Sequence, residues 1–152
     1  MKNAAFICFF FFALAAKAQQ LNEKGHYVDS EGNLFSGVIT ALNNGIKSEM
    51  EIKDGMANGK AAYYFASGKL MEAGLMANGV KDGQWIRYNE NGLTAAIGFY
   101  SGGKKSGTWT VFDYNGKKRM EMNYSNGEKS GVWTSWDENG AVAGTKNYGD
   151  AN

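Results

Sequence analysis

One phrase recurs in this chain at a fixed distance, and it constrains the fold more than any other feature. It opens with Gly-x-Trp, continues through a second aromatic residue and ends in Asn-Gly. Its three copies are GQWIRYNENG, GTWTVFDYNG and GVWTSWDENG, starting at Gly83, Gly107 and Gly131, which are 24 residues apart each time. A fixed period of this length is typical of stacked supersecondary units. The chain is therefore predicted to be a repeat protein.

Each copy contains two short runs of β-branched, aromatic and Met residues, separated by turn signals. No apolar stripe with the helical period of about 3.6 residues persists, so the runs are predicted to be strands. We expect an all-β fold, a single elongated and twisted antiparallel sheet of tandem β-hairpins with about nine or ten strands. The repeat domain is predicted to span 26–152, with a half-repeat cap at 26–36. Its units are predicted to start near residues 37, 59, 83, 107 and 131.

Two kinds of turn signal alternate along the repeats. One is an Asn-Gly pair, which favours a type I′ hairpin turn with positive φ at both residues. These pairs are Asn44-Gly45, Asn91-Gly92, Asn115-Gly116 and Asn139-Gly140, with Ser67-Gly68 as a variant. The other is Gly-x-x-x-Gly, which favours a wider hairpin loop or a bulge. It starts at Gly55, Gly79, Gly103 and Gly127.

The turn signals also predict a strand register. If Asn91-Gly92 is a two-residue loop, counting outward pairs Trp85 with Gly98. The same count at the next turn pairs Trp109 with Met122. A Trp beside a glycine can cover backbone that would otherwise be bare, and Met sulfur against an indole is a favourable contact.

The N-terminus has the features of a signal peptide. Lys2 precedes a run of 13 apolar residues, 4–16, and small residues at Ala16 and Ala18 form an A-x-A cleavage signature. A membrane-spanning helix needs about 20 apolar residues, so a retained signal anchor is the less favoured alternative. We expect a signal peptide at 1–18 cleaved near Ala18, a flexible lead at 19–25, and export to the periplasm, the outer envelope or the medium.

Charge argues against two classes of partner. Without Lys2 and Lys17, fourteen basic residues remain against fifteen acidic ones. Nucleic acids and anionic membranes usually select a basic face, so we expect no nucleic-acid binding and no strong membrane binding. The runs Lys104-Lys105 and Lys117-Lys118-Arg119 are interpreted as solvated turn charge.

The recurring G-x-W-x-x-[YFW]-x-x-x-G, followed by Y-x-x-G-x-x-x-G, resembles the bacterial variant of the MORN repeat between about Gly37 and Tyr148. The positions that carry the resemblance are Trp85, Trp109 and Trp133, then Tyr88, Phe112 and Trp136, and on the returning strand Tyr100, Tyr124 and Tyr148. Ala61 and Met76 depart from it. The resemblance implies a string of β-hairpins that serves scaffolding and protein binding rather than catalysis. Some relatives are labelled antitoxin components, a role that fits poorly with a signal peptide.

No catalytic or metal-binding motif is present in the sequence. Cys8 lies in the signal peptide, and His26 is the only histidine, so we expect no catalytic residue, metal or cofactor. Acidic residues before the Asn-Gly turns could pair in a hydrolase, which is a lesser alternative. These residues are Glu90, Asp113, Asp137 and Glu138.

The aromatic residues are the candidate binding surface. With strands about 4.8 Å apart, Trp85, Trp109 and Trp133 would stand roughly 10 Å from one another, either as core or as an open strip for a protein or sugar rings. A regular strand puts Trp85 and Tyr88 on opposite faces, so either a bulge joins them or both faces carry aromatics. The candidate residues are Trp85, Tyr88, Tyr100, Trp109, Phe112, Tyr124, Trp133 and Trp136.

These observations together predict a non-catalytic exported repeat protein. It would act as a protein-binding or scaffold module in the cell envelope or outside the cell, with a protein partner as the first choice. The alternative is a glycan-binding module that uses the Trp row.

Overall fold

The computed structural model describes residues 20–150. The predicted signal peptide and its cleavage near Ala18 lie outside the described residues. The strands are β1 (Gln20–Leu21), β2 (Tyr27–Val28), β3 (Gly37–Asn43), β4 (Ile46–Lys53), β5 (Met56–Tyr64), β6 (Leu70–Ala77), β7 (Val80–Tyr88), β8 (Thr94–Ser101), β9 (Lys104–Phe112), β10 (Lys118–Ser125), β11 (Glu128–Trp136) and β12 (Val142–Asn147). Between residues 20 and 150, no helix is long and apolar enough to cross a membrane.

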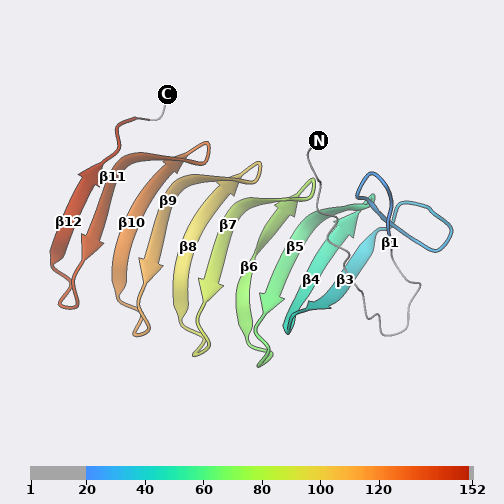
Figure 1. Cartoon of the computed structure of the whole chain (residues 1–152), viewed down its shortest axis with the longest axis horizontal. Coiled ribbons are helices and arrows are strands. Elements are labelled where there is room, and N and C mark those ends of the chain that lie inside the picture. The colour runs from blue at the N-terminus through green and yellow to red at the C-terminus, as the bar shows by residue number, and fades with distance from the viewer. Residues whose placement is uncertain (1–19, 151–152) are drawn as a thin grey trace, which may run out of the picture.

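Strands β3 to β12 form one open ten-stranded sheet in which each strand pairs with its neighbours in sequence. All of these pairs are antiparallel, and the hairpins lie side by side along the long axis of the molecule (Figure 1). The predicted all-β sheet of tandem hairpins is confirmed. The segment 19–25, expected to be a flexible lead, contains β1, which pairs with β2.

The opening glycines of the repeats occupy equivalent positions. Gly83, Gly107 and Gly131 all have positive φ, at 70°, 63° and 57°. Each lies where the strand register shifts against the preceding strand, for example between the pairs Leu75–Asp82 and Gly74–Trp85. A bulge with a left-handed residue favours glycine, because a side chain there is strained. The 24-residue period therefore records one bulge per hairpin.

The prediction exchanged the two kinds of turn. The first glycine of each Gly-x-x-x-Gly ends a tight two-residue turn with positive φ at both residues, and the second glycine lies in the bulge. These tight turns are Asp54-Gly55, Asn78-Gly79, Gly102-Gly103 and Asn126-Gly127. The bulge prediction is thus correct for the second glycine, and the wider loop predicted at the first is wrong.

The Asn-Gly pairs after the second aromatic residue form a wider turn. At Asn91-Gly92 only the glycine has positive φ, at 82°. Asn89 closes the turn, donating its N–H to the Leu93 carbonyl at 2.9 Å and accepting the Gly92 N–H at 2.9 Å. The same bonds recur from Asp113 and Asp137. The type I′ prediction is wrong at these three turns and at Ser67-Gly68, where only the glycine has positive φ, and correct at Asn44-Gly45, where both φ values are positive.

The predicted register is correct despite the wrong turn. Trp85 pairs with Gly98, and Trp109 pairs with Met122. The wider turn displaces the pairing by one residue, and a register shift next to Tyr88 restores it, since Ala95 lies unpaired between the pairs Tyr88–Thr94 and Arg87–Ala96.

The core is thin because the sheet has a single layer. Its buried apolar residues are Val28, Ile39, Ala41, Ile52, Ala57, Ala61 and Trp85. In the regular repeats, indoles cover backbone instead: a methyl group on Gly74 would overlap the Trp85 ring, and one on Gly98 would overlap the Trp109 ring. Each Trp therefore covers the strand that precedes its own, and the indole over Gly98 is that of Trp109.

A methyl group added at Gly98 tests whether the Trp109 indole covers the backbone there. Gly98→Ala should lower the free energy of unfolding by about 1–3 kcal/mol, because the Trp109 indole must move to admit it. The control is Gly144→Ala, whose new methyl would meet nothing nearer than the Ser135 Oγ at 3.5 Å, and it should stay within about 0.5 kcal/mol of wild type. Urea denaturation measures both, and equal losses would contradict the role given to Trp109.

Candidate binding surfaces

Both faces of the sheet carry aromatic side chains. We call the face with Trp85, Trp109 and Trp133 the front face and the opposite one the back face. The second aromatic residue of each repeat follows its Trp by three positions, so strand alternation places it on the back face. The structure thus has the second of the two arrangements considered from sequence, and it divides the candidate residues. Trp85, Tyr100, Trp109, Tyr124 and Trp133 lie on the front face, and Tyr88, Phe112 and Trp136 lie on the back face.

Seven rings on the front face form a continuous aromatic ladder. They are Tyr63, Trp85, Tyr100, Trp109, Tyr124, Trp133 and Tyr148, with successive ring centroids 4.7–6.4 Å apart. Most neighbouring rings are tilted or edge-on, an arrangement that aromatic pairs favour. Burial raises the pKa of Tyr63, Tyr100 and Tyr124 above the ordinary value of 10.0.

Each indole N–H is bonded to the backbone of the strand before it. Trp85 donates to the Leu75 carbonyl at 2.9 Å, and Trp109 donates to the Phe99 carbonyl at 3.1 Å. Trp133 repeats the bond to the next equivalent carbonyl at 3.0 Å. Because a buried indole N–H without a partner is costly, these bonds fix where each ring lies. Trp85 is only 2% exposed, and the other two indoles are half-buried.

A lysine stands over each of these indoles. The Nζ atoms of Lys81, Lys105 and Lys129 lie 3.9, 4.3 and 4.7 Å from the ring centroids of Trp85, Trp109 and Trp133. We call these three lysines the lysine row. Each ammonium group also lies within 4.8–5.4 Å of the centroid of the next Tyr ring along the ladder. The outer surface of the Trp row is therefore cationic.

The lysine row was not predicted from the sequence, although the sequence contains a pattern that indicates it. The residues follow the tight-turn glycine by two positions and recur at the same 24-residue period as the Trp residues. The interpretation of the basic runs as solvated turn charge is wrong for Lys105, and for Lys118, whose Nζ lies 4.1 Å from the Trp136 ring centroid. Strand alternation places the side chains of Lys105 and Lys118 on the same faces as the rings that they contact.

The row is unevenly neutralised. Lys81 forms an ion pair with Glu72 at 2.7 Å. Within residues 20–150, Lys105 and Lys129 form no ion pair. Their strand neighbours with carboxylates, such as Glu128, project to the back face by alternation. Positive charge thus accumulates on the front face of β9 and β11.

The back face carries an apolar patch in the middle of the sheet. Ala62, Ala73, Ile86 and Ile97 follow one another in register across β5 to β8. Leu75 and Phe99 lie on the same face two residues further along β6 and β8, beside this row, and are 51% and 41% exposed. These six residues form what we call the back patch. No other part of residues 20–150 lies over them as a second layer (Figure 1).

Polar clusters bound the back patch on both sides. On β4, Glu49 accepts the Tyr64 hydroxyl at 2.9 Å and pairs with Lys47 at 2.7 Å. The Lys47 hydrogen bond is the main cause of the lowered pKa of Glu49. On β10, Glu121 pairs at 2.9 Å with Lys118, the lysine that stacks on Trp136. The patch therefore has the apolar centre and polar rim that protein interfaces share.

A half-open hollow of about 650 Å³ lies near the wide turns, with Arg87, Glu90 and Asp113 among its lining residues. It forms where Ala95 and Ala96 stand in place of the larger Arg119 and Met120 found 24 residues later. Two of the four carboxylates considered for a hydrolase, Glu90 and Asp113, therefore share this hollow, whereas Asp137 and Glu138 are not among its lining residues.

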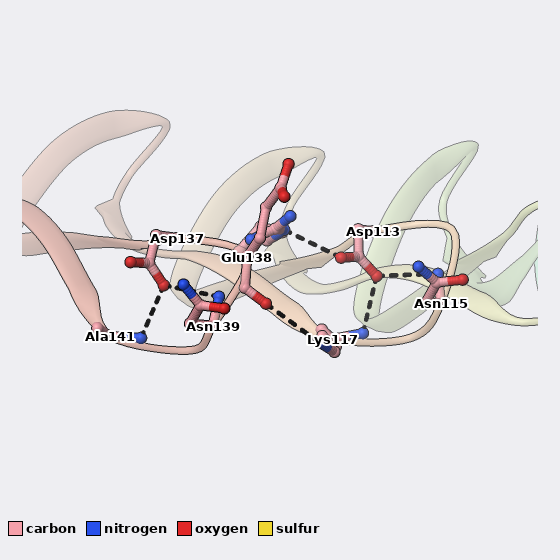
Figure 2. Close-up of polar contacts among 8 residues, drawn as sticks. Asp113, Asn115, Lys117, Asp137, Glu138, Asn139 and Ala141 are labelled. Atoms are coloured by element: carbon pink, nitrogen blue, oxygen red, sulfur yellow. Dashed lines mark hydrogen bonds and ion pairs between the residues drawn. The ribbon is translucent and has the colours of Figure 1, made fainter.

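The carboxylate of Asp113 is already occupied, as Figure 2 shows. Its Oδ1 accepts the N–H groups of Asn115 and Lys117 at 2.9 and 3.0 Å, and its Oδ2 lies 3.0 Å from Arg119 Nε. The backbone bond from Lys117 is the main cause of its lowered pKa, assisted by Asn115 and by the charge of Arg119. A carboxylate held ionised with both oxygens bonded suits a turn better than an acid catalyst.

The same side-chain bonds close the neighbouring turns. Asp137 Oδ1 accepts the N–H groups of Asn139 and Ala141, and Lys117 Nζ donates to the Glu138 carbonyl at 3.1 Å (Figure 2). Asn89 and Asp29 make equivalent pairs of bonds. Among residues 20–150, no three His, Cys, Asp or Glu side chains are grouped so that they could hold a metal ion.

Comparison with known proteins identifies the repeats. Residues 105–126 and 129–150 match the family model described as the MORN repeat variant. The two matched segments are 24 residues apart, each begins at a member of the lysine row, and both contain the Trp and Tyr of the ladder. A search of curated proteins found no match. The resemblance seen in the sequence is confirmed over these two segments.

Asp113 should make stability depend on pH. Its pKa is lowered in the folded state from an ordinary value of 3.8, so its contribution is complete above that value and is lost as pH falls through the folded pKa. Asp113→Asn keeps an acceptor for the turn, as Asn89 does, and should remove this part of the acid loss. Thermal unfolding from pH 7 to pH 2.5 measures both proteins, and parallel curves would contradict the assignment.

Proposed function

Because the chain carries MORN repeat variants, a non-catalytic repeat type that generally binds proteins or membranes, we propose that it is a protein-binding module of the cell envelope or the extracellular space. It would hold a partner against the back face of the sheet and so act as a scaffold. A ten-stranded sheet of one layer offers an extended surface for such contacts.

The observation that carries this proposal is the uncovered back patch. Its central row continues in register over four strands, β5 to β8. Exposed apolar surface of this kind, rimmed by polar groups, is typical of interaction sites. Leu75 and Phe99, the two most exposed members, would be the first to lose contact with water. The partner therefore needs an apolar surface of its own.

The other functions considered from the sequence have weaker support. For a neutral glycan, the Trp rings would have to stack on sugars, but each has backbone or strand on one side and a lysine ammonium on the other. For a hydrolase, Asp113 would have to leave the turn amides and Arg119. Protein binding needs no such rearrangement.

Export belongs to the proposal and is supported by the sequence of residues 1–18 alone. A charged start, a short apolar run and an A-x-A signature direct a chain through the secretory machinery. A sheet without cysteine, such as 20–150, can fold in an oxidising compartment without forming disulfides.

Localisation can be checked directly. The chain expressed in its native host should be recovered from the envelope or medium, and its N-terminal residue should be Gln19 because cleavage follows Ala18. Fractionation and N-terminal sequencing measure this. Ala16→Asp and Ala18→Asp together should block cleavage. Full-length chain in the cytosolic fraction would contradict export.

Aspartate substitutions test the back patch. Leu75→Asp and Phe99→Asp should each weaken partner binding roughly tenfold or more, because a charge would be desolvated at the centre of the interface. The control is Val132→Asp, which changes a 48% exposed residue of the same face outside the patch and should bind as wild type.

The partner is first identified by photo-crosslinking from position 99, with position 129 on the front face as the comparison site. Affinity for the purified partner is then measured for each variant. All three substitutions lie at exposed positions, so unfolding should change little. Equal crosslinking from both faces, or equal loss with Val132→Asp, would reject the back patch as the binding surface.

A further inference from the structure

The front face carries a regular line of positive charge that the proposed protein-binding function does not use. Lys81, Lys105 and Lys129 occur on β7, β9 and β11, so successive ammonium groups are two strands apart. With neighbouring strands about 4.8 Å apart, the spacing is roughly 10 Å. Lys146 on the adjacent strand β12, 5.0 Å from the Tyr148 ring centroid, adds positive charge to this end of the face but lies outside the two-strand spacing.

The rings hold these charges in place. A cation over an aromatic ring is attracted by the ring quadrupole, which restricts a side chain that is otherwise among the most mobile. Less rotamer entropy is then lost when a ligand binds. The lysines are thus ordered before any ligand arrives.

The positive charge of the front face is also not balanced by ion pairs in the repeats that are most alike. In the described part of the chain, Lys105, Lys129 and Lys146 form no ion pair, whereas Lys81 is paired with Glu72. Arg87 lies on the same face, because it follows Trp85 by two positions, and it likewise forms no ion pair there. A near-neutral chain therefore presents a cationic front face.

We propose that the lysine row binds an anionic, β-linked polysaccharide that carries one acidic group per disaccharide, with its chain running across the strands. Charges on alternate sugars of a β-linked chain recur at about the spacing of the row. Each acidic group then meets one ammonium group, and charge-assisted hydrogen bonds form. The aromatic ladder supports the lysines and does not itself contact the sugar.

Other polyanions fit the geometry less well. An acidic peptide has no charge repeat fixed at this distance, and an anionic membrane is a plane that selects positive charge without regard to a single line. A neutral glycan has nothing for the ammonium groups to bind. The regular line of lysines thus favours a linear polymer with a matching repeat.

Hyaluronan oligosaccharides provide the test, because one sugar in each of their β-linked disaccharides carries a carboxylate. Calorimetric titration at low salt should show binding to the full chain that weakens as salt is added. Lys105→Gln and Lys129→Gln should each weaken it roughly three- to five-fold, as expected for one exposed charge pair. The double substitution should weaken it roughly nine- to twenty-five-fold if the two free-energy effects add.

The matched control is a lysine with the same stacking on the other face of the sheet. Lys118→Gln removes a lysine that stacks on Trp136 of the back face and should change affinity less than two-fold. Lys81→Gln removes the member of the row that also pairs with Glu72, and it should weaken binding less than Lys105→Gln does. Lys105→Arg keeps charge and stacking and should restore binding. Urea unfolding of every variant separates lost affinity from lost stability.

Four results would overturn the proposal. Two concern hyaluronan itself: no binding at low salt, or binding no tighter than that of neutral chitin oligosaccharides. The third is tighter binding of polyglutamate or of phosphatidylglycerol vesicles than of hyaluronan, and the fourth is a loss of affinity from Lys118→Gln as large as that from Lys105→Gln. The proposed protein-binding function is tested separately. Its back-face variants Leu75→Asp and Phe99→Asp should keep polysaccharide affinity, and the lysine variants should keep affinity for the protein partner.

Discussion

The contact between each indole and the backbone of the preceding strand is the interaction on which the single-layer sheet depends. Most sheets bury one face against a second layer. In the described part of the chain, Tyr27 and Phe35 pack against the cluster of Ile39, Ile52 and Ala57 at one end of the sheet, and the regular repeats have no such cover. Trp109 instead covers Gly98 and donates to the Phe99 carbonyl, so apolar area is buried within the layer itself. Because the ring reaches back to the hairpin before it, each of these repeats is stabilised by its neighbour. One bulge and one Trp recur in the three repeats that start at Gly83, Gly107 and Gly131.

The repeat length, the strands and the register were predictable because they depend on spacing, which a sequence shows directly. The turns were not, because Asn-Gly occurs in two environments. After β7 the side chain of Asn89 accepts two backbone N–H groups and closes a wider turn, so Asn91 has no need of positive φ. At Asn78-Gly79 no such side chain is present, and both residues adopt it. At the Asn-Gly pairs, an Asn or Asp two positions earlier accompanies the wider turn, a relation that a dipeptide rule does not include. Ser67-Gly68 forms the same wider turn after Phe65, without a side-chain acceptor.

The candidate site was only partly predictable for a related reason. Composition and net charge describe the chain as a whole, whereas alternation distributes neighbouring residues to opposite faces. Lys105 and Ser106 are adjacent, yet only the lysine reaches the Trp109 ring. The aromatic residues were selected from the sequence as a set, but whether their rings are open to a ligand depends on the alignment of Lys105 with Trp109. The two residues are four apart and so share a face by alternation, and the lysine Nζ lies 4.3 Å from the ring centroid. That alignment is a property of three dimensions.

Differences between the repeats show how this fold can change locally while its sheet and turns stay the same. In the repeat with Asp113, Arg119 pairs with the carboxylate and fills the space beside the wide turn. One repeat earlier, Ala95 takes the place of Arg119, a hollow of about 650 Å³ opens, and the Asn89 Nδ2 has no hydrogen-bond partner in the described structure. The turn itself is unchanged, since Asn89 Oδ1 still accepts two N–H groups. Bulge, indole and turn bonds maintain the sheet, and so the residues between them can differ from one repeat to the next and give each face a chemistry of its own.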